Sequence, residues 1–104
     1  MKVFISQPMK GKSGKEITKQ RKQIKKLLTA KLKESIDIID QRAKCIPFDI
    51  LFSPESLALF KLGQSVSCMA EADLVVMAKG WQNARGCRLE YEVAKAYKKP
   101  ILVL

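Results

Sequence analysis

Glu90 is the residue of this sequence whose position most suggests chemistry. A helical period of 3.6 residues places it on the apolar stripe of residues 85–99, RGCRLEYEVAKAYKK, together with Gly86, Val93, Ala94 and Tyr97. No basic residue lies three or four positions away from it on this helix, whereas Glu92 shares a surface face with basic residues. A carboxylate on such a stripe either finds hydrogen-bond partners on other elements or is held there for chemistry, and both interpretations stay open.

The chain contains no histidine, so any general acid or base is a carboxylate, Lys, Tyr or Cys. Its three cysteines, Cys45, Cys68 and Cys87, are odd in number and widely spaced. This spacing and the lack of histidine argue against a zinc site. We therefore expect neither a metal nor a cofactor.

The stretch MKGKSGK, residues 9–15, is a candidate anion site. A triphosphate-binding loop of the Walker type needs a glycine five residues before Gly11, and that position is Ser6. Two glycines and three lysines remain in front of a helix start, where free N–H groups favour an anion. The sequence predicts that this loop binds one phosphate, or the hydroxyl that replaces it. The alternative is a solvated basic turn.

Charge is concentrated in one segment. The net charge is +10, and ten of the twenty basic residues lie between Lys10 and Lys33, with Glu16 as the single acid. Such a segment attracts nucleic acid, an anionic membrane or a small anionic substrate, or it is one solvated helix face. Residues 10–34 contain no aromatic side chain, which argues against base stacking but not against phosphate contact. A non-enzymatic nucleotide- or nucleic-acid-binding module is therefore the alternative function.

The elements that must position these residues alternate along the chain. Strands are predicted at residues 2–6, 35–40, 72–78 and 100–104, and helices at 14–34, 55–70 and 85–98, with a long loop over 41–56. This alternation predicts one α/β domain over residues 1–104, a small three-layer sandwich of the Rossmann or flavodoxin type with a four-stranded parallel sheet. With strand order 2-1-3-4, the ligand site lies at the carboxyl ends of the first and third strands.

No apolar run is long enough to cross a membrane, so we expect a cytoplasmic protein without a membrane partner.

Two loops, residues 7–13 and 79–85, converge at that point. Trp81 is placed to stack on a nucleobase, with a hydrophobic plug or a subunit contact as alternatives. Arg85, near a helix start, favours anion binding. A packing role is favoured for Cys87 over a reactive thiol.

Two blocks of the chain, VFISQPMKG at the start and ADLVVMAKGWQNARGCRLEYEVAKAYKKPILVL at the end, resemble the nucleoside 2-deoxyribosyltransferase-like proteins, including a short bacterial and phage branch. By this resemblance Glu90 is the nucleophile that attacks the anomeric carbon, and Asp73 is the second carboxylate, which assists the sugar hydroxyl or the leaving base. Without the resemblance, a capping or turn role at the start of a strand is as well supported for Asp73 as a catalytic role.

The resemblance implies cleavage or transfer at the N-glycosidic bond of a deoxynucleoside or its 5′-monophosphate. It also implies a homodimer or a higher homo-oligomer, because the family completes its sites across subunits. Together with the two converging loops it gives a set of substrate-binding residues, namely Ser6, Gln7, Pro8, Met9, Lys10, Gly11, Lys12, Gly80, Trp81, Asn83, Arg85, Gly86 and Cys87.

Overall fold

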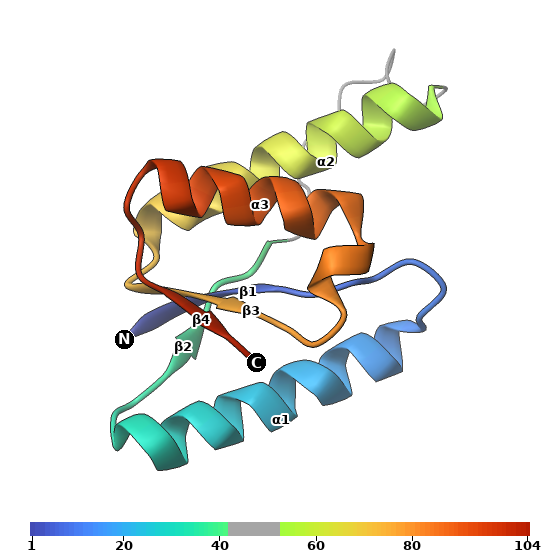
Figure 1. The fold of residues 1–104 in the computed structure, drawn as a ribbon. Coiled ribbons are helices and arrows are strands. Elements are labelled where there is room, and N and C mark those ends of the chain that lie inside the picture. Colours follow the sequence, from blue (N-terminus) through green and yellow to red (C-terminus); the bar gives the residue numbers. More distant parts are fainter. Residues whose placement is uncertain (42–52) are drawn as a thin grey trace.

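The computed structural model describes residues 1–41 and 53–104 and shows alternating strands and helices (Figure 1). The strands are β1 (Lys2–Ser6), β2 (Asp37–Ile38), β3 (Leu74–Met77) and β4 (Ile101–Val103). The helices are α1 (Gly14–Leu32), α2 (Pro54–Cys68) and α3 (Arg85–Ala96), with short 3-10 turns η2 (Met69–Glu71) and η3 (Trp81–Asn83). No helix in the described part of the chain is both long and apolar enough to span a membrane.

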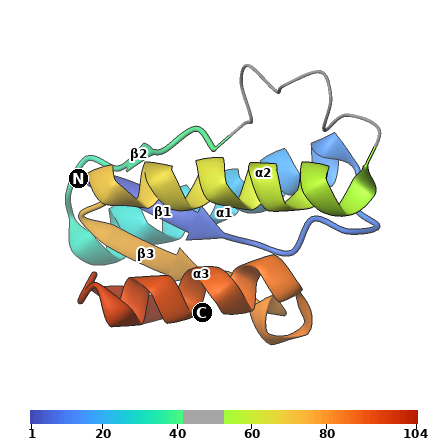
Figure 2. The same cartoon turned by 90° about the horizontal axis from the view of Figure 1, so that it is seen from above.

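The four strands form one parallel sheet in the order β2-β1-β3-β4. The first crossover runs from β1 to the β2 edge, and the next two run in the opposite direction. Because such crossovers are right-handed, α1 covers one face and α2 and α3 cover the other (Figure 1). Figure 2 shows α2 and α3 side by side over that second face. This is a flavodoxin-like α/β fold, as the sequence predicted.

Alternation along β1 assigns its side chains to the two layers. Val3 and Ile5 pack with Ile24 and Leu28 of α1, whereas Phe4 packs in the cluster beneath α2 and α3. Ser6 is two residues beyond Phe4 and therefore faces the same side as Phe4. The end of the central strand thus presents a hydroxyl, rather than an apolar group, to the α2 and α3 layer.

The element boundaries are shorter than the sequence suggested, most clearly for the second strand. Residues 35–40 read as a strand, but only Asp37 and Ile38 pair with β1. Helix α1 begins after Ser13, whose hydroxyl accepts from the Glu16 amide at 3.2 Å, and ends at Lys33 in a left-handed conformation. The predicted loop over 41–56 falls largely on residues 42–52, which lie outside the described part of the chain.

Candidate functional site

Glu90 lies at the carboxyl end of β1, and both of its carboxylate oxygens accept a hydrogen bond. Ser6 Oγ donates to Oε1 at 2.6 Å, and Ser65 Oγ of α2 donates to Oε2 at 2.5 Å. The side chain is 7% exposed. The prediction that this carboxylate faces inward is therefore confirmed, and its partners come from two other elements. Tyr97, which was placed on the same stripe, is 79% exposed because it lies beyond the end of α3.

Ser65 is connected further to the end of β2. Its Oγ also lies 3.3 Å from Gln41 Oε1, and Gln41 Nε2 donates to the Ile5 carbonyl at 2.7 Å. A chain of polar groups therefore runs from Glu90 through α2 to the backbone of β1. Each buried polar atom in this chain has a partner, as buried polar groups require.

Burial dominates the electrostatics of Glu90. It raises the pKa of the carboxyl above its ordinary value of 4.5, because a charged group loses solvation in the interior. The hydroxyls of Ser6 and Ser65 and the positive charge of Arg21 act in the opposite direction and lower that pKa. Burial thus disfavours the charged form of Glu90, and the neighbouring donors and the positive charge offset part of that effect.

Cys87 lies in the first turn of α3 and is 4% exposed. Burial raises the pKa of its thiol above 9.0, with smaller opposing effects from a hydrogen bond to Ser6 and from the charge of Lys12. The thiol is therefore protonated near neutral pH and packs in the apolar cluster with Phe4 and Met77. This supports the packing role that the sequence favoured over a reactive thiol.

Gln7 faces the opposite layer and is 4% exposed. Its Nε2 donates to Gln20 Oε1 at 2.8 Å, and its Oε1 accepts from Arg21 Nε. These contacts use both ends of the amide to attach the end of β1 to α1. The same contacts direct Arg21 toward the carboxyl end of the sheet, where its charge acts on Glu90.

The stretch MKGKSGK forms a tight turn followed by the start of α1. The Lys12 amide donates to the Met9 carbonyl at 3.1 Å, and Gly11 has a φ of 79°, which the third residue of a type II turn requires. The Lys12 amide is thus used inside the turn. Met9 through Lys12 are exposed, so the side chains of this turn and the first amides of α1 are accessible to an anion.

The two predicted loops meet at the site. Gly80 has a φ of 89°, and a Cβ built on it would lie 3.6 Å from Pro8 Cγ. Trp81 stacks on Tyr91 with 4.7 Å between ring centroids and packs against the core under α2 and α3. Its indole N–H is buried and has no acceptor among the described residues. This packing favours the hydrophobic plug. Asn83 and Arg85 are exposed, and Gly86 is half-buried.

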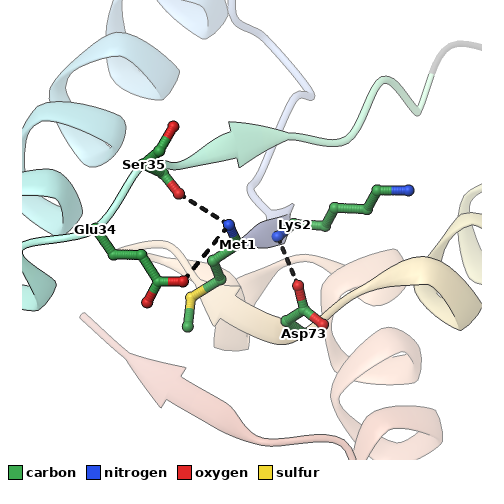
Figure 3. Close-up of polar contacts among 5 residues, drawn as sticks. All are labelled: Met1, Lys2, Glu34, Ser35 and Asp73. Carbon is green, nitrogen blue, oxygen red and sulfur yellow. Dashed lines mark hydrogen bonds and ion pairs between the residues drawn. The ribbon is translucent and has the colours of Figure 1, made fainter.

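Asp73 is not brought to this site. It precedes β3 at the amino end of the sheet, and its Oδ2 accepts a hydrogen bond from the Lys2 amide at 2.8 Å (Figure 3). The Asp73 amide in turn donates to the Lys2 carbonyl at 2.8 Å. Asp73 thus ties β1 to β3, and β3 itself separates it from Glu90.

A surface cavity of about 450 Å³ lies at the β2 edge beside the end of α2. Like Asp73, it is remote from Glu90. It is lined by Lys2, Asp37, Ile38, Ile39, Asp40, Ser67, Cys68 and Glu71.

Ser65, Gln41 and Arg21 also contribute to the surroundings of Glu90, and none of them was predicted from the sequence. A signal for Ser65 was present, since it lies three residues after Leu62 and four before Met69, on the side of the helix that should be apolar. A hydroxyl on that stripe raises the same question as Glu90 does. No comparable pattern marks Gln41 or Arg21, whose roles depend on which elements become neighbours.

Comparison with protein families assigns the chain. Residues 1–103 match the model of a domain of unknown function, DUF4406. The chain belongs to the DUF4406 family. No curated protein and no solved structure matches it. The family match spans all the helices and strands described above, but the family has no assigned function. The chemistry must therefore be inferred from the site.

Proposed function

We propose that this DUF4406 protein cleaves or transfers the N-glycosidic bond of a deoxynucleoside or a deoxynucleoside 5′-monophosphate, with Glu90 as the nucleophile. The observation that carries the proposal is the Glu90 carboxylate itself. It is 7% exposed, lies at the switch point of a parallel sheet, and is held by one hydroxyl on each oxygen. The residues that resemble the deoxyribosyltransferase-like proteins lead to the same position.

The reaction uses one carboxylate oxygen of Glu90. That oxygen forms a bond to C1′ of the sugar while the bond from C1′ to the base nitrogen breaks, and the electron pair leaves with the base, which takes a proton from solvent. Water, or the nitrogen of a second base, then attacks C1′ and loses a proton, and Glu90 is released as a carboxylate. Because the Glu90 carboxylate is poorly solvated, its negative charge stabilises the positive charge that develops on the sugar ring.

The groups around Glu90 fit an anionic ligand. The charge of Arg21 acts on Glu90 and the charge of Lys12 acts on Cys87, so two cations lie close to the carboxyl end of β1. The exposed ammonium of Lys10 is on the adjacent turn. These side chains and the first amides of α1 are suited to one 5′-phosphate. Ser6 stands where a Walker loop needs its first glycine, and the Lys12 amide is bonded within the turn, which argues against a triphosphate.

The test is release of free base. The protein is incubated with the four deoxynucleosides and their 5′-monophosphates, and the products are separated by chromatography, with and without a second base as acceptor. We expect base release from at least one substrate by the natural protein and none by Glu90→Gln. Glu92→Gln is the matched control, because Glu92 lies on the same helix but is exposed. Equal activity in Glu90→Gln, or no release from any substrate, overturns the proposal.

A second candidate function is binding of a nucleic-acid backbone by α1. Nine lysines of α1 and its flanks are exposed, and none forms an ion pair with a described residue. They are Lys10, Lys12, Lys15, Lys19, Lys22, Lys25, Lys26, Lys31 and Lys33. Unpaired lysines on one outer helix favour contact with regularly spaced phosphates.

Fluorescence anisotropy with labelled DNA and RNA, single- and double-stranded, tests this candidate. Affinity should fall steeply as salt rises, with a slope set by the number of phosphates contacted. Replacing Lys22, Lys25 and Lys26 by Gln should weaken binding to every sequence alike. Absence of binding at low salt removes this candidate and leaves the glycosidic reaction unaffected.

A further inference from the structure

We propose that Ser65 is a positioning residue that, together with Ser6, fixes the orientation of the Glu90 carboxylate for attack on the sugar. This inference rests on the proposed function, because it assigns a role to the carboxylate that the reaction uses. Neither the family description nor the sequence pattern assigns a role to Ser65.

The last torsion of a glutamate side chain is broad, so a carboxylate with one partner rotates over a wide range. Glu90 has a donor on each oxygen, at 2.6 Å from Ser6 and 2.5 Å from Ser65. The donors belong to β1 and α2, while Glu90 belongs to α3. Three elements therefore determine the plane of the carboxylate. Each oxygen keeps a second lone pair, and one of these is available to the anomeric carbon.

Ser6 and Ser65 are not equivalent. Ser6 is 1% exposed at the end of the central strand, whereas no residue of α2 is fully buried. The Ser65 hydroxyl has one proton but two acceptors within reach, Glu90 Oε2 at 2.5 Å and Gln41 Oε1 at 3.3 Å. While Glu90 is ionised, the Ser65 hydroxyl donates its proton to Glu90 Oε2, because that contact is shorter and its acceptor is charged. Once the carboxylate has formed its bond to C1′ and lost its charge, the hydroxyl can donate to Gln41 instead.

The experiment measures the ionisation of Glu90 directly. The side-chain carboxyl carbons of glutamate are labelled with ¹³C, the Glu90 signal is assigned by its absence in Glu90→Gln, and its shift is followed against pH. Ser65→Ala removes a donor to the charged form, so we expect the titration midpoint of Glu90 to move upward. Ser65→Thr keeps the hydroxyl and should leave the midpoint near that of the natural protein. Ser67→Ala is the control, since its hydroxyl donates to the Gln64 carbonyl and not to Glu90.

The pH profile of base release gives a second readout. If Ser65 positions the carboxylate, Ser65→Ala should lower kcat by about 10-fold and shift the acidic limb of the profile to higher pH, whereas Ser67→Ala should change neither. KM should change little, because Ser65 contacts Glu90 and not the substrate in this scheme. If Ser65→Ala does not fold, Ser65→Cys, with a weak donor of similar size, replaces it.

The outcomes separate this inference from the proposed function. An unchanged Glu90 midpoint in Ser65→Ala, or an equal upward shift in Ser65→Thr, overturns the positioning role, whatever the activity. The NMR titration needs no substrate, so it stands even if no nucleoside is cleaved. In that case an upward shift of the Glu90 midpoint in Ser65→Ala but not in Ser65→Thr supports the Ser65 contact. The missing base release then overturns the proposed function.

Discussion

Two carboxylates occupy opposite ends of the same parallel sheet, and their partners differ. Asp73, at the amino end, is exposed and accepts from a backbone amide, that of Lys2 at 2.8 Å. Glu90, at the carboxyl end, is 7% exposed and accepts only from side-chain hydroxyls in the described structure. The first contact connects two strands. The second connects three elements, β1, α2 and α3, through side chains alone.

This difference indicates how to separate structural from functional carboxylates. A carboxylate that satisfies a backbone N–H near the surface lowers the free energy of the fold at little desolvation cost. A carboxylate buried among hydroxyls carries a desolvation penalty, which its neighbours only partly offset, and such a penalty is typical of catalytic groups. The comparison therefore predicts that changes at Glu90 affect activity and changes at Asp73 affect stability.

The largest expected effect is that of Glu90→Gln on activity. Removal of the nucleophile should reduce base release by roughly 10³-fold or more, as loss of a covalent catalyst does in other enzymes. The same substitution should raise the thermal unfolding temperature at pH 7, because the amide is not charged and the hydroxyls of Ser6 and Ser65 can still bond to it. Activity and melting are measured on the same preparation. A loss of both stability and activity would make Glu90 a structural residue and erase the contrast with Asp73.

The next effect concerns the anion site at the carboxyl end. Replacing Lys10 and Lys12 together by Ala should weaken binding of a deoxynucleoside 5′-monophosphate by about 1 to 3 kcal/mol, the range for charge-assisted contacts, and hardly change binding of the unphosphorylated nucleoside. Isothermal titration calorimetry measures both ligands. Lys31→Ala with Lys33→Ala removes the same charge at the far end of α1 and is the control. Equal losses for the two ligands would mean that Lys10 and Lys12 only shape the turn.

A smaller effect is the pH dependence of stability. Burial raises the pKa of Glu90 in the folded state above 4.5, so the folded protein binds this proton more tightly than the unfolded chain does. Its contribution to stability is therefore fully present below the unfolded pKa and is lost as pH rises through the folded pKa. Urea unfolding between pH 4 and pH 8 should show this loss in the natural protein and a flatter curve in Glu90→Gln. Identical curves would mean that the surroundings of Glu90 do not disfavour its charge.

The fold was predictable because its signals are local. Apolar runs such as LVVM in β3 and the Ser13 cap of α1 depend on a few neighbouring residues, and the handedness of the crossovers then decides which face of the sheet each helix covers. The inward position of Glu90 followed from helical period alone. The length of β2 did not, because only two of its six predicted residues form register pairs with β1.

The site was predictable only in part because hydrogen-bond partners come from elements distant in the sequence. Ser65 lies 25 residues before Glu90 and Ser6 lies 84 residues before it. The sequence marked Ser6 as a substrate contact, which stays a prediction, but it did not indicate that the Ser6 hydroxyl donates to Glu90. Asp73 matched a family carboxylate, but its place before β3 puts it at the amino end of the sheet. In a parallel sheet, a residue that precedes a strand lies at the amino end and a residue that follows a strand lies at the carboxyl end. The resemblance matched Asp73 by sequence and did not consider its position relative to the strand.

The smallest expected effect is that of Asp73→Ala, and it completes the comparison. Loss of the acceptor for the Lys2 amide should lower the free energy of unfolding by about 0.5 to 1.5 kcal/mol, the net value of one hydrogen bond, while kcat for base release stays unchanged. Asp73→Asn keeps an acceptor oxygen in the same place and should lose less. Urea unfolding and base release are measured for both variants at pH 7. A fall in kcat with unaltered stability would place Asp73 in the reaction after all, and the rule that separates the two carboxylates by their partners would fail for this fold.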